Sequence, residues 1–174
     1  YQLDGRPSVL PTLQWREGDH LYWHGSSASR AIRAMEGADV CITVTLMDGY
    51  VLARSAFHHS VNFRSAMVFG RAEKIVDLAA KEARLKAMTD GLFPGRWETL
   101  RPITEQEIKA TAVLRIPIEE ASAKIRDGAP KDDDEDYALP IWAGVVPMSL
   151  QLQHPEADPA NLSGVNMPDH LSRI

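Results

Sequence analysis

Cysteine is nearly absent from this sequence, because Cys41 is the single one among 174 residues. One thiol cannot form an internal disulfide, so a disulfide-stapled scaffold is excluded and nothing indicates an oxidising compartment. Long apolar runs are also lacking, since no stretch approaches the ~20 apolar residues of a membrane-spanning helix. No signal peptide is apparent. These absences predict a cytoplasmic protein without a membrane partner.

Basic residues are fewer than acidic ones. The chain has 19 Lys and Arg against 24 Asp and Glu, a net charge of -5 and a sequence pI of about 5.7. Binding of nucleic acid through phosphate neutralisation needs a basic surface, so this class of partner is not expected. The hydrophobic content of 44% and charged content of 25% are typical of a soluble globular domain.

The common catalytic and cofactor motifs are missing. The sequence has no Gly-rich dinucleotide fingerprint, no P-loop, no His-Glu-x-x-His and no Cys-x-x-Cys. His58 and His59 are adjacent and would point to opposite faces of a strand, so a metal site that uses both is not expected. No residue stands out as a general acid or base, and we assign no catalytic residue and no metal ligand.

Turn signals divide the first half of the chain into strands. Asp48-Gly49 lies between an alternating apolar run over residues 40–46 and the run 50–53, which predicts a tight hairpin because glycine permits a positive φ. Glu17-Gly18 predicts a second hairpin between residues 8–15 and 20–24. Residues 63–76 read as a long strand with a bend at Gly70. Many short strands favour a barrel or sandwich over a parallel α/β sheet.

Helices are few, and capping residues mark their starts. Residues 29–35 predict a short helix followed by Gly37, where a left-handed cap would lie. Asp77 is the expected N-cap of a longer helix with one apolar face. Thr104 and Glu107 have the spacing of a capping box.

The last third of the chain is less regular. Residues 131–136 form a charge run, which we interpret as a solvated loop. Beyond His154 the chain is rich in Pro, Asn, Asp and Ser, which favours an extended or disordered tail. We therefore expect one domain over residues 1–150 and a tail over residues 151–174.

One segment suggests a ligand. Residues 21–30 run from a strand through small polar residues into the start of a helix, where unpaired backbone N–H groups carry a partial positive charge. The Ser29 hydroxyl and the Arg30 guanidinium would add donors suited to a phosphate. The alternative is that Ser29 only caps the helix and Arg30 is an ordinary surface residue.

Several segments together resemble a known family. They include Tyr-Trp-His-Gly-Ser at 22–26 followed by Ser29-Arg30, and the remaining ones occupy residues 7–12, 57–73, 93–97, 122–126 and 139–144. In order and spacing they are similar to the flavin-binding split-barrel proteins related to pyridoxamine 5′-phosphate oxidase, in the branch that contains nitroimidazole-resistance reductases. The resemblance implies a mainly β fold, a six-stranded antiparallel Greek-key split β-barrel with a few flanking helices. It also implies a homodimer that binds FMN in a groove between the subunits.

The resemblance assigns the first part of the FMN site to one subunit. Ser29 and Arg30 match the Ser-Arg pair that binds the FMN phosphate in the family. His24, Gly25 and Ser26 match the strand end beside the ribityl chain and the phosphate. Two more residues belong to a strand that lines the flavin ring with backbone groups, namely Pro11 and Thr12.

The second part of the implied site is less closely matched. Ser65 stands where the oxidase has a Gln that touches the flavin. The partner subunit's contribution falls on Lys124 when strands are aligned and on Trp142 when residue types are matched, and we favour Lys124. Trp142 has the alternative of a core or dimer-interface residue.

The resemblance leads to three functional hypotheses. The first is an FMN-dependent oxidoreductase that passes electrons from a reduced nicotinamide to a small organic acceptor. Oxidation of pyridoxamine phosphate itself is not expected, because the oxidase's C-terminal Arg and His have no counterpart after residue 150. The second is a flavin-binding or redox-sensing module without turnover. The third is a haem-binding split barrel, for which the candidate ligands are His20, His24, His58 and His59.

Overall fold

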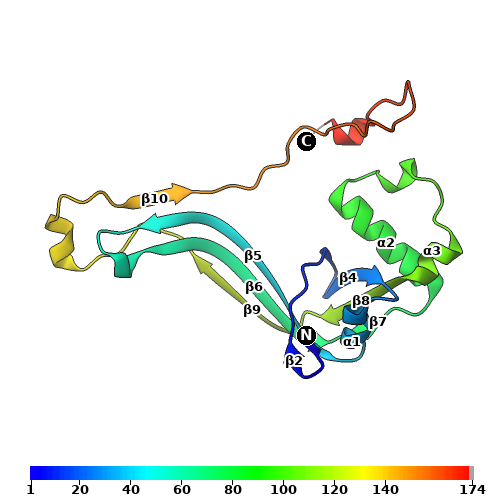
Figure 1. Cartoon of the computed structure of the whole chain (residues 1–174), viewed down its shortest axis with the longest axis horizontal. Coiled ribbons are helices and arrows are strands. Elements are labelled where there is room, and N and C mark those ends of the chain that lie inside the picture. Colours follow the sequence, from blue (N-terminus) through cyan, green and yellow to red (C-terminus); the bar gives the residue numbers. More distant parts are fainter. Residues whose placement is uncertain (173–174) are drawn as a thin grey trace. The chain divides into compact units, whose positions relative to one another are not determined.

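The computed structural model describes residues 1–172 and is mainly β with few helices, as expected (Figure 1). The chain forms two compact units. The first comprises Tyr1–Cys41, Phe69–Glu120 and the segment from Leu152 onward, and the second comprises Ile42–Val68 and Ala121–Gln151. None of the helices in the described residues is long and apolar enough to cross a membrane.

The sheet of the first unit is buried on both faces. It has the order β3-β4-β8-β7, built from β3 (Gln14–Glu17), β4 (His20–Ser26), β8 (Thr111–Pro117) and β7 (Glu73–Lys74), with antiparallel pairs. Tyr22 and Val113 pack against Leu85 of helix α2 (Leu78–Leu92). The neighbouring residues of the same strands, Trp23 and Leu114, are also fully enclosed. Because successive strand side chains point to opposite faces, both faces of this sheet carry core residues.

The hairpin expected around Glu17-Gly18 is present but shorter than predicted. β3 begins at Gln14, and the preceding residues 8–13 form no strand. Gly18 adopts a positive φ of 55°, as the turn requires. The strand stops short because Pro11 lacks an N–H for a ladder, and the apolar side chains of this segment, such as Val9, are exposed.

The hairpin predicted at Asp48-Gly49 is wrong. Both residues lie inside one long strand, β5 (Asp39–Leu52), which pairs with β10 (Gly144–Pro147). A Cβ atom on Gly49 would lie 2.8 Å from the carbonyl oxygen of Val146. Glycine therefore serves here to admit the backbone of a neighbouring strand, which is the other common role of a strand glycine.

The second sheet has the order β10-β5-β6-β9, with β6 (Ser60–Arg71) and β9 (Glu120–Arg126). The strand predicted over residues 63–76 thus starts earlier and ends at Arg71, and the chain then enters the first sheet as β7. The buried apolar residues of the second unit are small and few, namely Val51, Ala53 and Val68.

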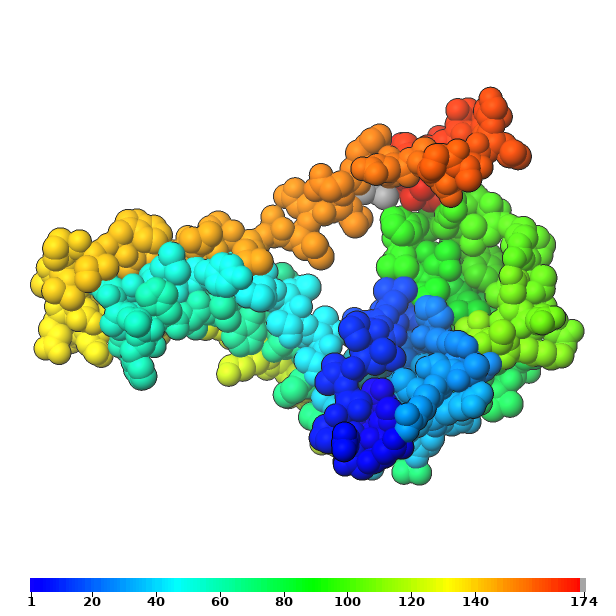
Figure 2. Space-filling model, in the orientation of Figure 1, coloured from blue at the N-terminus to red at the C-terminus, as the bar shows by residue number. Residues whose placement is uncertain are grey.

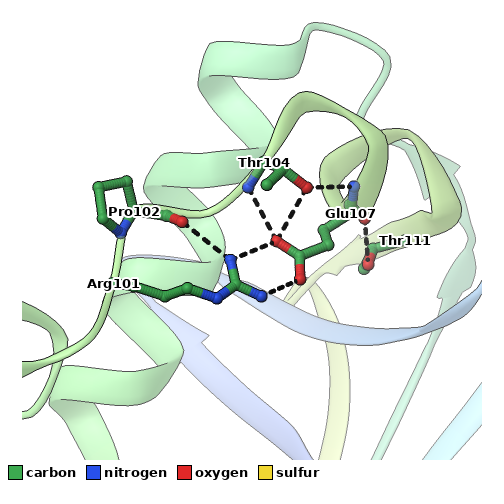
Figure 3. Close-up of polar contacts among 5 residues, drawn as sticks. All are labelled: Arg101, Pro102, Thr104, Glu107 and Thr111. Carbon is green, nitrogen blue, oxygen red and sulfur yellow. Dashed lines mark hydrogen bonds and ion pairs between the residues drawn. The ribbon is translucent and has the colours of Figure 1, made fainter.

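The helix starts agree with their predicted caps. Ser29 caps α1 (Arg30–Met35), which Gly37 follows with a φ of 70°, and the Asp77 carboxylate accepts from the Ala80 amide that opens α2. Thr104 and Glu107 form the predicted capping box of α3 (Glu105–Ala110), as Figure 3 shows. Local hydrogen bonds therefore determine where these helices begin.

The charge run at residues 131–136 is not a simple solvated loop, which corrects the prediction. The Asp132 side chain is fully enclosed and paired with Arg54, and a short 3-10 helix, η3 (Asp134–Ala138), follows it. In the space-filling view this yellow segment lies directly against the turn between β5 and β6 (Figure 2). Beyond it, residues 151–168 contain neither helix nor strand, and a 3-10 turn, η4 (Asp169–Leu171), lies near the end.

Candidate functional site

The end of β4 and the start of α1 are held together closely. A Cβ atom on Gly25 would lie 2.8 Å from Cγ1 of Ile32, so only glycine lets the helix approach the strand to this degree. The Ser26 hydroxyl accepts from the Ala28 amide at 3.2 Å, and the Ser29 hydroxyl accepts from the Ile32 amide at 3.4 Å. Ser29 is thus a helix cap, one of its two predicted roles, and its position at the helix start is the one that the phosphate role requires.

Arg30 already has an acidic partner. Its guanidinium pairs with the Asp4 carboxylate, and both side chains are 69% exposed. Asp4 occupies the turn between β1 (Gln2–Leu3) and β2 (Arg6–Pro7) and adopts a left-handed φ of 52°. An exposed ion pair contributes about 0–1 kcal/mol to stability. A phosphate could therefore displace Asp4 from Arg30 or bind the guanidinium beside it.

His24 is half-buried, which favours the neutral form of its ring. Burial lowers its pKa, and Nδ1 is enclosed without a hydrogen-bond partner in the described part of the chain. Its ring lies 6.2 Å from that of Trp15. His24 therefore offers an unsatisfied polar atom at the strand end, and its neutral form adds no cationic charge for a phosphate.

Pro11 and Thr12 do not lie on a strand, contrary to the sequence-based prediction. Both are exposed in the segment before β3. Their predicted contact with a flavin ring through strand backbone has no strand to support it within this chain.

Two further predicted residues meet on neighbouring strands of the second unit. The Ser65 hydroxyl on β6 donates to the carbonyl oxygen of Lys124 on β9 at 3.5 Å. The Lys124 ammonium lies 6.0 Å from the ring centroid of Phe63. Trp142 precedes β10, is 69% exposed and covers Gly144, whose Cβ would lie 2.8 Å from the indole ring. Trp142 is thus not a core residue of this chain, and the choice between Lys124 and Trp142 stays a prediction.

A polar cluster that the sequence analysis missed surrounds His59. His58 is the last residue of a 3-10 helix, η1 (Ala56–His58), and His59 is its C-cap, so neither lies on a strand and the argument that they face opposite ways does not apply. His59 Nδ1 lies 2.8 Å from the Ser55 carbonyl oxygen. A carbonyl only accepts, so Nδ1 carries the proton and the neutral ring has its free lone pair on Nε2. His58 Nε2 instead lies 3.4 Å from a carboxylate oxygen of Asp133.

A buried ion pair supports this cluster from a distant part of the chain. Asp132 accepts from the Arg54 amide at 2.8 Å and from the Arg54 guanidinium at 3.0 Å. Burial alone would raise the pKa of the Asp132 carboxyl, but these hydrogen bonds and one from the Ser55 amide outweigh it and lower the pKa. No local signal could reveal the pair, because 78 residues separate its members.

The histidine and carboxylate side chains described above do not form a site for a bare metal ion, but a single histidine among them could ligate a haem iron. Residues 1–172 contain no group of three or more His, Cys, Asp or Glu that could hold a metal ion. Haem iron needs only one or two axial ligands from the protein, and histidine is the common one. Among the other candidates, His20 lies beside the Tyr22 ring at 6.1 Å. His170 was not among the sequence candidates, and its Nε2 is enclosed without a partner in the residues described.

Two solved structures are similar to this chain over nearly its whole length. The search of curated proteins found no match. Among solved structures, the flavocytochrome Anf3 from Azotobacter vinelandii is 53% identical, and the match covers 99% of this chain and 80% of that chain with a TM-score of 0.95. An FAD- and haem-binding protein from Mycobacterium smegmatis is 40% identical over 98% of this chain and 84% of that chain, with a TM-score of 0.93.

A family model described as pyridoxamine 5′-phosphate oxidase matches residues 1–125, which is most of the chain. The segments that carried the resemblance from residues 7–12 to 93–97 fall within this match and 122–126 reaches its end, whereas 139–144 lies outside it. The chain therefore belongs to the pyridoxamine 5′-phosphate oxidase family.

Proposed function

We propose that this protein binds a flavin and a haem and transfers electrons between them. The observation that carries this proposal is the similarity, over almost the whole chain, to one protein described as a flavocytochrome and to another described as FAD- and haem-binding. A flavin accepts two electrons and a haem iron one, so the cofactors supply the redox chemistry and the protein supplies binding and electrostatics. The haem alternative of the sequence analysis is thus favoured over a flavin-only oxidoreductase.

The identity of the flavin is revised. The resemblance implied FMN, whereas the relative from Mycobacterium smegmatis is described as binding FAD. FMN and FAD share the phosphate next to the ribityl chain. The predicted role of Ser29 and Arg30 fits both, and we favour FAD.

His59 is the residue best placed to ligate the haem iron. Metal-ligating histidines usually donate their other ring N–H to a carboxylate or a backbone carbonyl, which fixes the tautomer and the ring orientation. His59 has this arrangement through the Ser55 carbonyl, and His59 is exposed. Phe57, which is 89% exposed two residues earlier, offers an apolar face for the macrocycle. His58 is a weaker candidate because its Nε2 faces Asp133.

A homodimer would complete the second unit. An unpartnered apolar surface of this extent on a small protein marks an interaction site. A second copy related by a two-fold axis is the partner that the family resemblance implies, and it would cover the flavin ring. The exposed apolar residues of this unit are Leu46, Met47, Tyr50, Phe57, Met67, Ile125, Tyr137, Leu139, Ile141, Trp142, Val146, Met148 and Leu150.

The test is the visible spectrum of the purified protein, followed by mass spectrometry of the flavin that heating releases. We expect flavin bands together with a Soret band, and FAD in the supernatant. The variant His59→Ala should lose the Soret band and keep the flavin bands, whereas the control His154→Ala, in the exposed tail, should keep both. A colourless wild-type protein that takes up neither cofactor would overturn the proposal. An unchanged Soret band in His59→Ala would place the ligand elsewhere, with His170 next in line.

The electron donor is tested separately. We expect a reduced nicotinamide to bleach the flavin bands of the loaded protein under anaerobic conditions and then to sharpen the haem bands as iron is reduced. Bleaching of the flavin without a change at the haem would show that the two cofactors do not exchange electrons. That result would leave flavin binding in place but contradict the proposed transfer.

A further inference from the structure

We propose that Asp132 is a positioning residue for the haem: its buried carboxylate fixes the Ser55 carbonyl and thereby aims the Nε2 lone pair of His59. This inference rests on the proposed haem binding. All the residues involved belong to the second unit, so no relation between the units enters the argument.

The Asp132 carboxylate accepts hydrogen bonds from the backbone and the side chain of Arg54. One carboxylate oxygen accepts from the Arg54 amide at 2.8 Å, and the other accepts from the Arg54 guanidinium at 3.0 Å. The Ser55 amide also lies near this carboxylate and helps to lower its pKa. With its side chain 0% exposed, Asp132 therefore holds the backbone amide and the guanidinium of Arg54 in place from inside the fold.

Ser55 is hydrogen-bonded to both histidines. The Ser55 hydroxyl accepts from the His58 amide at 3.4 Å and opens the 3-10 turn. The Ser55 carbonyl accepts the His59 Nδ1 proton at 2.8 Å. The peptide group that carries this carbonyl lies two peptide groups after the one whose Arg54 amide Asp132 binds, so a displaced Asp132 would shift the carbonyl and release the imidazole ring.

The charged Arg54 side chain is itself held in place by its neighbours, which fixes the position of the Asp132 carboxylate. Its side chain is 21% exposed, and the guanidinium lies over the Tyr137 ring at 4.8 Å from the centroid. The Tyr137 hydroxyl accepts from the Asp132 amide at 3.4 Å. Arg54, Asp132 and Tyr137 thus contact one another pairwise. An uncharged residue at position 132 would leave the mostly buried Arg54 guanidinium without its counter-ion.

The test compares Asp132→Asn with the matched control Asp133→Asn. Asp133 is the next residue, is 73% exposed and faces His58, not the Ser55 backbone. Haem-free protein that retains flavin is titrated with haemin, and the dissociation constant and the Soret position are measured. Loss of an outer-shell partner typically costs 10- to 100-fold in metal affinity, and we expect a loss of about tenfold or more for Asp132→Asn. Asp133→Asn should bind haemin within about twofold of wild type.

A double-mutant cycle separates positioning from a general structural role. If Asp132 acts through His59, then Asp132→Asn should weaken haemin binding in the wild type and change nothing further in a His59→Ala background. Haem retained by Asp132→Asn should also show a shifted Soret band that added imidazole restores. An equal loss in both backgrounds, or wild-type affinity in Asp132→Asn, would overturn the inference while leaving haem binding established.

Two outcomes need a second measurement. If Asp132→Asn does not fold, as judged by lost flavin, Arg54→Lys keeps the charge and the backbone contacts but removes the guanidinium fork. It should lower haemin affinity by a smaller factor, and unchanged affinity would overturn the inference. If the wild-type protein retains flavin but binds no haemin, the proposed haem function fails and this inference fails with it.

Discussion

Arg30 has one acidic partner in the structure, and the family resemblance predicts a second. It pairs with Asp4 on the surface, and the family resemblance places it beside the flavin phosphate. The phosphate-binding role of Arg30 could be predicted from the sequence because Ser29-Arg30 follows a strand end at a helix start. Asp4 was not readable as its partner, because the pairing depends on a left-handed turn 26 residues earlier.

Replacing Arg30 tests the phosphate role. We expect Arg30→Ala to weaken flavin binding by about 1.5–3 kcal/mol, the range for a hydrogen bond to a charged group, which is roughly a 10- to 150-fold rise in the dissociation constant. The matched control is Arg16→Ala, another exposed arginine paired with an aspartate, Asp19. Flavin titration of both variants gives the answer, and wild-type flavin affinity in Arg30→Ala would show that the phosphate lies elsewhere.

At the scale of elements, local and distant interactions differ in how well the sequence reveals them. The starts of α1, α2 and α3 were predicted correctly because each depends on a side chain that bonds to an amide within three residues. The hairpin at Asp48-Gly49 was not, because the strand partner of Gly49 is Pro147, far along the chain. The polar cluster at residues 54–59 was missed for the same reason, since Asp132 completes it.

The capping box of α3 predicts a pH dependence. The Arg101 side chain, with smaller contributions from the Thr104 amide and hydroxyl, lowers the pKa of Glu107 from 4.5 to about 2 (Figure 3). Because the folded pKa is depressed, the stabilisation is complete above pH 4.5 and is lost as the pH falls through 2. Glu107→Gln should therefore flatten the acid side of the melting-temperature profile between pH 4.5 and 2. An unchanged profile would contradict the prediction.

The N-cap of the same helix gives a simpler stability test. The Thr104 hydroxyl accepts from the Glu107 amide at 3.2 Å. Thr104→Ala should cost about 1 kcal/mol in urea unfolding, whereas Thr104→Ser keeps the hydroxyl and should lie near wild type. Equal losses in both variants would show that the methyl group, and not the cap, matters.

Two glycines in different elements predict opposite effects of alanine. Gly49→Ala would place a methyl group 2.8 Å from the Val146 carbonyl oxygen, and we expect a loss of about 1–3 kcal/mol. Gly91 lies in α2 with open space around its Cβ position, so Gly91→Ala should stabilise the protein by up to ~1 kcal/mol. Urea titrations of both variants measure the change in the free energy of unfolding. An unchanged value for Gly49→Ala would mean that β10 can shift to admit the methyl group without loss of stability.

For the whole molecule, the many expected strands predicted a mainly β fold, and the family resemblance predicted the split barrel and the family itself. They were not enough for the cofactors. The first choice was a flavin-only enzyme, and His59 was one of four candidate ligands in the haem alternative, because a haem ligand carries no sequence motif that would single it out. The relatives at 53% and 40% identity are what shift the proposal to two cofactors.

The proposed dimer is testable on the intact protein. We expect sedimentation equilibrium at micromolar concentration to give twice the chain mass of 19.3 kDa. The physical reason is the exposed apolar surface of the second unit, which includes Trp142 at 69% exposure. A monomer of chain mass that nevertheless retains flavin would contradict a cofactor site shared between subunits.

The pairing of Arg54 with Asp132 has a consequence for synthesis on the ribosome. Arg54 and the turn that carries His59 emerge first, and the carboxylate of Asp132 emerges only when the chain has been translated 78 residues past Arg54. A nascent chain that ends before Asp132 would therefore present the imidazole without its brace. If the protein binds haem as proposed, loading would then follow the emergence of Asp132, and ribosome-bound intermediates of increasing length should acquire haemin affinity only once residue 132 has left the exit tunnel.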